Sequence, residues 1–324
     1  MFEFKNFQLK RFSSLHKLIS KVNIKLFITL ICFVFLGKSI YGNFDDLALQ
    51  IITLNKVVWL SVGIIFSFLS IFINAYAWKL LINSIGCDSN KFNIIKLFLD
   101  TNIYKYLPGG VWHFISRYNL LRRKFSAEKS VESILLEPLL MLVAGLVFIP
   151  FGSFNIIIFI FCWSSPFLFI TGFRKFIVAK LKSMKANIFI KNDNMNHKII
   201  IKNNQNISPK ISYPYRALIV EILFIFCRFF GFLCCVNAFS IGSLVSNGDL
   251  ISSFSLAWII GLIVPAAPGG LGVFESVILF SLGSQLPEAL LLASLLCYRL
   301  VSTLSDVLAA LVYPVGNYLK FNLK

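Results

Sequence analysis

The sequence predicts an all-α polytopic membrane protein with about six full transmembrane helices and two broken or re-entrant helical hairpins. Three observations predict this fold class. The chain of 324 residues is 57% hydrophobic, with a mean hydropathy of +0.80. Only 14% of its residues are charged, against roughly 25% in a soluble domain. Two proline-glycine breaks interrupt stretches that are otherwise apolar, a pattern that indicates a transporter-type site at the centre of a membrane.

Six apolar runs approach the roughly 20 residues that a helix needs to cross the hydrocarbon core. The first carries Lys38 and has no small-residue cleavage site, so we interpret it as an uncleaved span rather than a signal peptide. Trp59 and Trp78 lie near the ends of the second run, as in an interfacial aromatic belt. The expected spans cover residues 24–41, 57–81, 130–151, 154–170, 215–239 and 288–313.

Two further apolar segments, 94–121 and 251–286, each contain a Pro-Gly-Gly sequence. Proline removes a backbone donor and glycine adds backbone freedom, so both segments are expected to break as helices. A broken helix at membrane depth must be buried in protein or line a cavity. We therefore expect two re-entrant hairpins. The alternatives are a cytoplasmic loop with an interfacial helix for the first segment, and two short ordinary spans for the second.

The formal net charge of +17 is explained by basic loops between apolar runs, which indicate membrane orientation rather than nucleic-acid binding. Residues 171–216 carry ten Lys/Arg and one acid, whereas residues 42–56 carry two acids and one Lys. Basic and poorly charged loops alternate as six spans require, which places both termini in the cytoplasm. The chain then begins with a basic cytoplasmic N-terminus (1–23), followed by a membrane region (24–170) that contains the first half and, as its last span, the start of the second half (154–170). A basic cytoplasmic loop (171–214) leads to the rest of the second half (215–313) and to a cytoplasmic tail (314–324).

This topology makes the two halves an inverted repeat. Each half has three spans with a broken segment before the third, and the two halves enter the membrane from opposite sides. The Pro-Gly-Gly sequences start at Pro108 and Pro268, 160 positions apart. Beyond these motifs the halves share no convincing residue-level identity, so the repeat is inferred from the pattern of spans.

Charged residues inside spans are costly and need a partner or a wet cavity. Arginine binds phosphate oxygens in a fork, and amides at broken helix ends add donors. The candidate substrate-binding residues are therefore Arg117, Arg228, Arg299, Gly109, Gly110, Gly269 and Gly270. Acids in the same segments are candidates for proton or headgroup coupling, namely Glu137, Glu221, Glu275 and Asp306.

The alternative for these charges is that they pair with one another and lock the bundle. Glu221 and Arg228 are seven residues apart, as are Arg299 and Asp306, so each pair shares a helix face but spans about 10.5 Å. Bonds across to another helix are therefore expected. Glu275 follows the second break, where it either caps a helix or meets an amine of the ligand.

No catalytic set, metal site or cofactor is expected. His113 lacks a readable nucleophile partner, and the three histidines are scattered. The seven cysteines form no Cys-x-x-Cys motif, and all but Cys87 lie in apolar runs.

Two motifs resemble the membrane region of the lysylphosphatidylglycerol synthase/flippase family. They read Lys105-Tyr106-Leu107-Pro108-Gly109 followed by Arg117, and Pro268-Gly269-Gly270-Leu271-Gly272-Val273 followed by Glu275. The resemblance implies a protein of the bacterial cytoplasmic (inner) membrane whose relatives move an aminoacylated phospholipid between leaflets. Bifunctional members append a soluble aminoacyl-transferase domain, and because this chain ends at Lys324 we expect no lipid-aminoacylating activity.

The leading hypothesis is a lipid translocase, without enzymatic activity, that moves or binds a phospholipid or another lipid-linked polar headgroup. Its partner is a membrane lipid: an anionic or aminoacylated phospholipid, or a polyprenyl-linked sugar. No nucleic-acid partner is expected, and the sequence is compatible with a homo-oligomer. One alternative is a membrane-embedded enzyme or accessory subunit in lipid-linked glycan synthesis. Such an enzyme would need an acidic pair near the membrane face, and Asp45 and Asp46 are the only close acidic pair in a loop. Another alternative is a non-transporting assembly partner.

Overall fold

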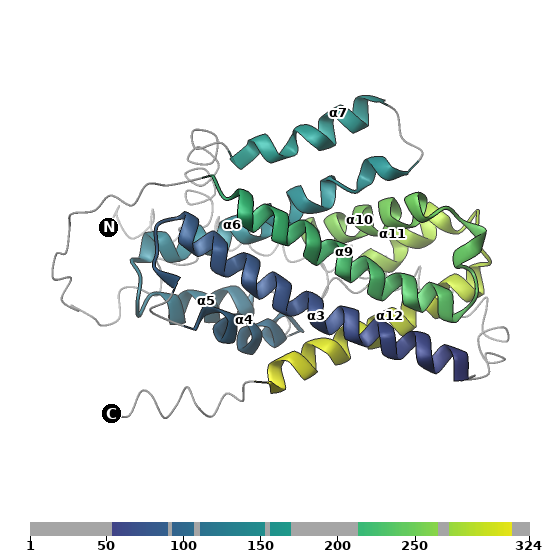
Figure 1. Ribbon diagram of the computed structural model, residues 1–324, viewed down its shortest axis with the longest axis horizontal. Coiled ribbons are helices and arrows are strands. Elements are labelled where there is room, and N and C mark those ends of the chain that lie inside the picture. Colours follow the sequence, from purple (N-terminus) through teal and green to yellow (C-terminus); the bar gives the residue numbers. More distant parts are fainter. Residues whose placement is uncertain are drawn as a thin grey trace, which may run out of the picture.

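A computed structural model gives the arrangement of the chain (Figure 1). All regular structure in the described residues is helical, which confirms the predicted all-α class. The expected span at 24–41, the loop at 171–212 and both Pro-Gly-Gly sequences lie outside the described residues. The structure describes residues 54–89, 93–106, 111–152, 156–169, 213–264 and 272–312.

Four helices in the described part are long and apolar enough to cross a membrane. Each covers a run that the sequence predicted as a span. The run expected at 154–170 is described in two shorter pieces, α7 (Ile156–Ser164) and η4 (Ser165–Phe169). The four long helices are α3 (Leu54–Ser84), α6 (Ala127–Leu146, continued by η3, Ile149–Phe151), α9 (Tyr215–Ala238) and α12 (Glu288–Leu311).

The first broken segment forms α4 (Ile94–Asn102), η2 (Ile103–Tyr106) and α5 (Trp112–Leu121). Asn93 begins α4 as an N-cap, because its side chain accepts a hydrogen bond from the Lys96 amide. At about 1.5 Å per residue, neither α4 nor α5 approaches the roughly 30 Å of a hydrocarbon core.

The second broken segment forms α10 (Asn247–Ile263) and α11 (Val273–Leu282). Ser246 caps α10, and the helix ends at Ile263, two residues before Pro265. Gly272 precedes α11 with φ +86°, a conformation that glycine adopts without steric cost. The helices α10 and α11 pack against each other, and Ser252 on α10 donates a hydrogen bond of 2.7 Å to the carbonyl of Ile149 in η3.

The centre of the bundle is the pair α3 and α9, which run antiparallel (Figure 1). Phe66 stacks on Phe230 with ring centroids 5.4 Å apart. Gly63 and Gly231 face each other where the helices cross, and a Cβ on Gly231 would lie 2.4 Å from Oγ of Ser67. Small residues thus permit the close approach that stabilises helix pairs in membranes.

The remaining helices surround this pair. The helix α12 packs against α3, α9 and α4, whereas α6 packs against α9, α3 and α10. The helix α5 joins α4 to α6, and α11 joins α10 to α12. Each broken segment therefore contacts both of the long helices α6 and α12.

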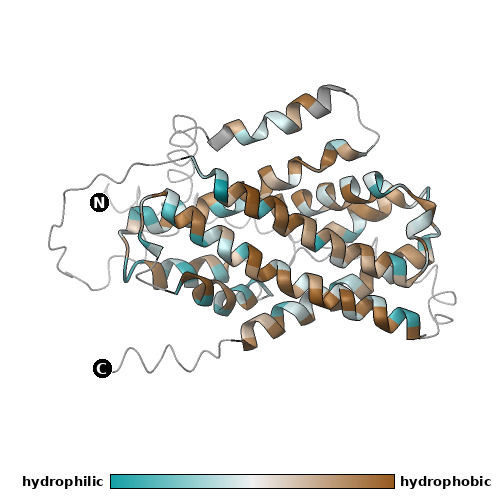
Figure 2. Ribbon diagram, viewed as in Figure 1, coloured by the Kyte–Doolittle hydropathy of each residue, from teal (hydrophilic) through white to brown (hydrophobic). Residues whose placement is uncertain are grey.

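Many large apolar side chains are exposed on the helices, whose residues Figure 2 colours largely as hydrophobic. Phe280 is 90% exposed and Leu300 is 72% exposed, and Ile65, Ile160 and Ile219 are exposed as well. Extended exposed apolar surface is a liability in water but fits a lipid environment. The polar side chains described next lie inside the bundle.

Candidate functional site

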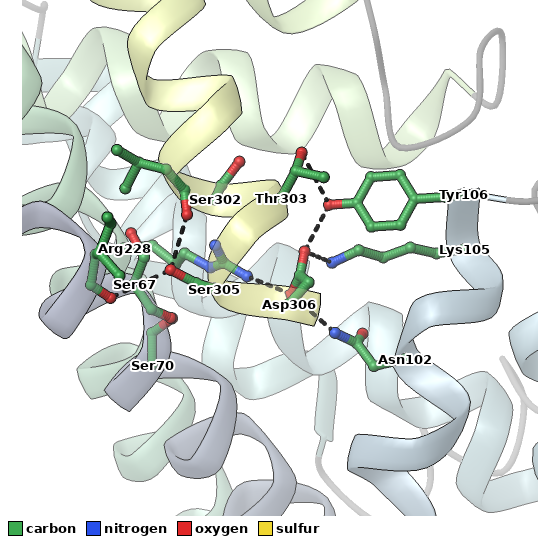
Figure 3. A network of polar contacts seen from close by, with 12 residues as sticks. Ser67, Ser70, Asn102, Lys105, Tyr106, Arg228, Ser302, Thr303, Ser305 and Asp306 are labelled. Carbon is green, nitrogen blue, oxygen red and sulfur yellow. Dashed lines mark hydrogen bonds and ion pairs between the residues drawn. The ribbon is translucent and has the colours of Figure 1, made fainter. Parts of the chain in front are cut away.

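Asp306 on α12 is the centre of a buried polar cluster (Figure 3). Its Oδ1 accepts hydrogen bonds from Nδ2 of Asn102 at 2.9 Å and from a guanidinium nitrogen of Arg228 at 3.2 Å. Its Oδ2 accepts from the Tyr106 hydroxyl at 2.6 Å and from Nζ of Lys105 at 2.7 Å. Side chains from α4, η2 and α9 thus converge on one carboxylate.

The Asp306 cluster carries more positive than negative charge. Arg228 and Asp306 are almost fully buried, whereas the Lys105 side chain is 26% exposed. Two cations therefore share one carboxylate, and the more accessible cation stands just before the first Pro-Gly-Gly sequence. A surplus positive charge in an apolar bundle favours the binding of an anionic group.

Three hydrogen-bond donors beside this cluster have no acceptor in the described part of the chain. They are Nε of Arg228, Nε1 of Trp258 and the hydroxyl of Tyr298. The Arg228 guanidinium lies 5.9 Å from the Trp258 ring, and the Phe254 ring lies between those of Trp258 and Tyr298 at 6.1 and 5.9 Å. Buried donors are nearly always satisfied, so these three indicate a place for an acceptor group.

A second buried cluster centres on Arg117 of α5, which is 1% exposed. Its guanidinium lies over the rings of Trp78 at 5.0 Å and Phe98 at 4.0 Å. It donates to Oγ1 of Thr101 at 3.1 Å and to Glu137 of α6 at 2.5 Å. Aromatic faces and a charge-assisted bond together hold this arginine in a sealed position.

The third ion pair joins α11 to α12. The Arg299 guanidinium bonds both carboxylate oxygens of Glu275, and its second bond measures 3.2 Å. The Gly272 amide also donates to Glu275 at 2.8 Å, so the Glu275 side chain caps the start of α11. Of the two alternatives for Glu275, the structure therefore contains the helix cap. The Arg299 side chain is 22% exposed.

The three candidate arginines pair across helices with three of the candidate acids, as the spacing of the sequence indicated. Glu221 is the exception, because its Oε1 is buried without a hydrogen-bond partner in the described residues. The candidates Gly109, Gly110, Gly269 and Gly270, and the acids Asp45 and Asp46, lie outside the described residues.

Sequence reasoning missed Asn102, Lys105 and Tyr106 as members of the site. Asn102 is polar in an apolar segment, and Lys105-Tyr106 directly precedes the first break. That proximity was the available signal, but their convergence on Asp306, about 200 residues away, is a tertiary feature. His113 is partly buried, and its ring lies 3.8 Å from that of Phe114.

Long apolar helices, a lipid-compatible surface and paired charges inside the bundle define a multi-pass membrane protein. A family model described as "Lysylphosphatidylglycerol synthase TM region" matches residues 22–310. The chain therefore belongs to this family, which confirms the resemblance seen in its two motifs. No curated protein matches the chain.

Proposed function

We propose that the protein is a lipid translocase that binds a lipid headgroup inside the bundle and moves it between the leaflets of the bacterial cytoplasmic membrane. No chemical change of the lipid is part of this proposal. The proposed cargo is a phospholipid or another lipid whose headgroup carries a phosphate, and both termini are proposed to be cytoplasmic.

The observation that carries the proposal is the excess of positive charge around Asp306. Lys105 is partly exposed and shares the carboxylate with buried Arg228. A lipid phosphate that reached Lys105 would replace Asp306 as its counter-ion, while Asp306 kept Arg228. Such an exchange of partners binds an anion without leaving a buried charge alone.

Neighbouring groups supply further support for a phosphate or hydroxyl-rich headgroup. Trp258 and Tyr298 offer neutral donors, and the free Nε of Arg228 offers a charged one. The start of α11 contributes less than the sequence suggested, because Glu275 already occupies it. We therefore assign the main anion contact to Lys105 and Arg228, with Arg299 and the glycine amides of the breaks as secondary candidates.

We also propose that the two halves form an inverted repeat with re-entrant broken segments. Glu275 follows Arg117 by 158 residues and Arg299 follows Glu137 by 162, close to the spacing of the two breaks. In each half an ion pair joins the helix after the break to the following long helix, with the charges exchanged. Reporter fusions in loops 42–56 and 171–216 should report opposite sides of the membrane, and a common side would refute the repeat.

Reconstitution in vesicles tests translocation directly. The purified full chain should accelerate leaflet exchange of fluorescent phosphatidylglycerol more than that of a fluorescent diacylglycerol, which lacks the phosphate. Lys105→Gln should slow the phosphatidylglycerol rate about tenfold, corresponding to one lost charge-assisted bond. Lys124→Gln, at an exposed position after α5, is the matched control. Equal rates for Lys105→Gln and Lys124→Gln would refute the proposed site. No acceleration with any headgroup would refute the proposed function.

A further inference from the structure

Glu221 on α9 is a deeply buried carboxylic acid. It is 1% exposed, and its Oε1 receives no hydrogen bond in the described part of the chain. Three other acids of the interior are paired: Glu137 with Arg117, Glu275 with Arg299, and Asp306 with Lys105 and Arg228. Asp100 on α4 is also buried, and its carboxylate oxygens have no hydrogen-bond partner in the described residues. Glu221 differs from Asp100 because it lies on the same helix as Arg228. An ionised carboxylate with no partner is strongly disfavoured in an apolar interior, so Glu221 is favoured in its neutral, protonated form.

The charged group that acts on Glu221 from α6 reinforces this assignment. Glu137 interacts with Glu221 electrostatically and repels its negative form. Arg117 supplies one positive charge to this group and donates to Glu137 rather than Glu221. Two acids and one base therefore share the space, and a single proton on Glu221 balances the charge.

The helix α3 places an acceptor at the level of Glu221. In the antiparallel pair, Phe66 contacts Phe230, and Lys56 lies 4.9 Å from the Phe239 ring. Because α3 and α9 are antiparallel, residues further along α3 face residues earlier in α9. Counting forward from Phe66 and backward from Phe230 reaches Asn74 and Glu221 at about the same height along the helix pair. Asn74 is 5% exposed, and its Oδ1 has no donor in the described residues. A protonated Glu221 is the type of donor that this amide oxygen lacks.

Among the described residues, the other elements around α9 provide no cation that is paired with Glu221. On α12, the partly exposed Arg299 is paired with Glu275 and the buried Asp306 with Arg228, which lies two turns further along α9. Asp249 stands in the first turn of α10. Tyr76 and Lys79 stand on the same end of α3 as Asn74, where Tyr76 is exposed and Lys79 half-buried.

We propose that Glu221 is the proton-carrying residue that couples lipid movement to proton movement, an inference that rests on the proposed translocase function. In one state Glu221 holds a proton taken from water on one side, in an O–H bond that leaves the interior neutral. Release of this proton to water on the other side leaves a carboxylate next to Glu137. The resulting repulsion favours a different packing of α9 against α6.

The same movement reaches the headgroup site because Arg228 is on the same helix. Seven residues of α-helix rise about 10.5 Å, so Glu221 and Arg228 are rigidly linked two turns apart. A shift of α9 that relieves the repulsion at Glu221 also changes the distance between Arg228 and Asp306. Protonation and headgroup binding are thereby coupled through one rigid element, as alternating access requires.

Proteoliposomes with a pH difference across the membrane test this coupling. At steady state, one proton moved per lipid shifts the ratio of fluorescent phosphatidylglycerol between leaflets about tenfold for each pH unit. We expect such a shift for the wild-type chain, a reduced one for Glu221→Asp, and none for Glu221→Gln. Glu128→Gln, an exposed acid in the first turn of α6, is the matched control and should keep the shift.

A second measurement does not depend on transport. The wild-type chain at neutral pH should show infrared absorption from protonated carboxyl groups, and Asp100→Asn serves as the reference because Asp100 is a second buried acid without a hydrogen-bond partner in the described residues. Adding Glu221→Gln to Asp100→Asn should remove further absorption, while the thermal unfolding temperature stays unchanged. Identical carboxyl absorption in Asp100→Asn with and without Glu221→Gln would overturn the protonation. Leaflet exchange that ignores the pH difference in the wild type would overturn the coupling and leave the proposed function intact, whereas complete absence of exchange would refute the function itself.

Discussion

The ion pairs Arg117–Glu137 and Glu275–Arg299 each join the helix after a Pro-Gly-Gly sequence to the next long helix, but they differ in their surroundings. Arg117 lies between Trp78 and Phe98 and is 1% exposed. The Arg299 guanidinium lies 5.2 Å from the centre of the Phe274 ring, and the Arg299 side chain is 22% exposed. The first pair is sealed inside the bundle, whereas the second has an arginine that solvent or a headgroup can reach.

The acids of the two pairs differ as well. Glu137 lies within α6, and Arg117 is its hydrogen-bond partner in the described residues. Glu275 stands at the start of α11, where the Gly272 amide and the helix dipole stabilise its charge independently of Arg299. Similar pairs of residue types therefore differ in exposure: the Arg117 pair is buried, whereas the Arg299 side chain of the other pair is partly exposed.

The largest expected effect comes from breaking the sealed pair. Arg117→Met should lower the free energy of unfolding by about 3–5 kcal/mol, because it leaves the buried Glu137 carboxylate without its partner. Thermal unfolding in detergent measures this loss. Adding Glu137→Leu to Arg117→Met should recover most of the stability, since the unpaired charge is then gone. A double variant no more stable than Arg117→Met alone would contradict this explanation.

An intermediate effect is expected at the accessible pair. Arg299→Gln should lower stability by only about 1 kcal/mol, because solvent screens the arginine and Glu275 keeps its amide bond. Leaflet exchange should nevertheless slow about tenfold if Arg299 contributes one charge-assisted bond to the headgroup. Measuring unfolding and exchange on the same preparation separates the two roles. A stability loss as large as that of Arg117→Met would show that the two pairs do not differ.

The smallest effect is expected for Glu275→Gln. The side-chain oxygen of glutamine can also accept from the Gly272 amide, so α11 keeps its N-terminal cap and the cost is about 0.5 kcal/mol. Glu275→Ala removes the cap as well and should cost about 1 kcal/mol more. Comparing the two unfolding temperatures isolates the cap from the charge. Equal temperatures would mean that the hydrogen bond from Gly272 contributes nothing to stability.

Much of the fold could be predicted from sequence because hydropathy and helix breaking are local properties. The runs at 57–81, 130–151, 215–239 and 288–313 coincide with long helices, and helices end or begin on either side of both Pro-Gly-Gly sequences. The family was also evident from short motifs, and the family model confirms it. The arrangement of the halves and the re-entrant paths stay predictions.

The candidate site was predicted in part. The sequence identified Arg228 and Asp306 because a charge inside an apolar run is conspicuous. It did not identify Asn102 or Tyr106, since polar uncharged residues are common near helix ends. The sequence also could not show that Oε1 of Glu221 has no hydrogen-bond partner in the described residues, because this depends on which side chains surround Glu221 in the folded protein.

By itself the sequence determined that this chain is a helical membrane protein with breaks at two places and charges inside its apolar segments. Only the tertiary structure decided which charges meet. The partners of Asp306 come from residues 78 to 204 positions away, and small residues such as Gly63 and Gly231 set the helix contacts that bring distant segments together. Ion-pair energy depends on distance and burial in space, and neither follows from the order of residues along the chain.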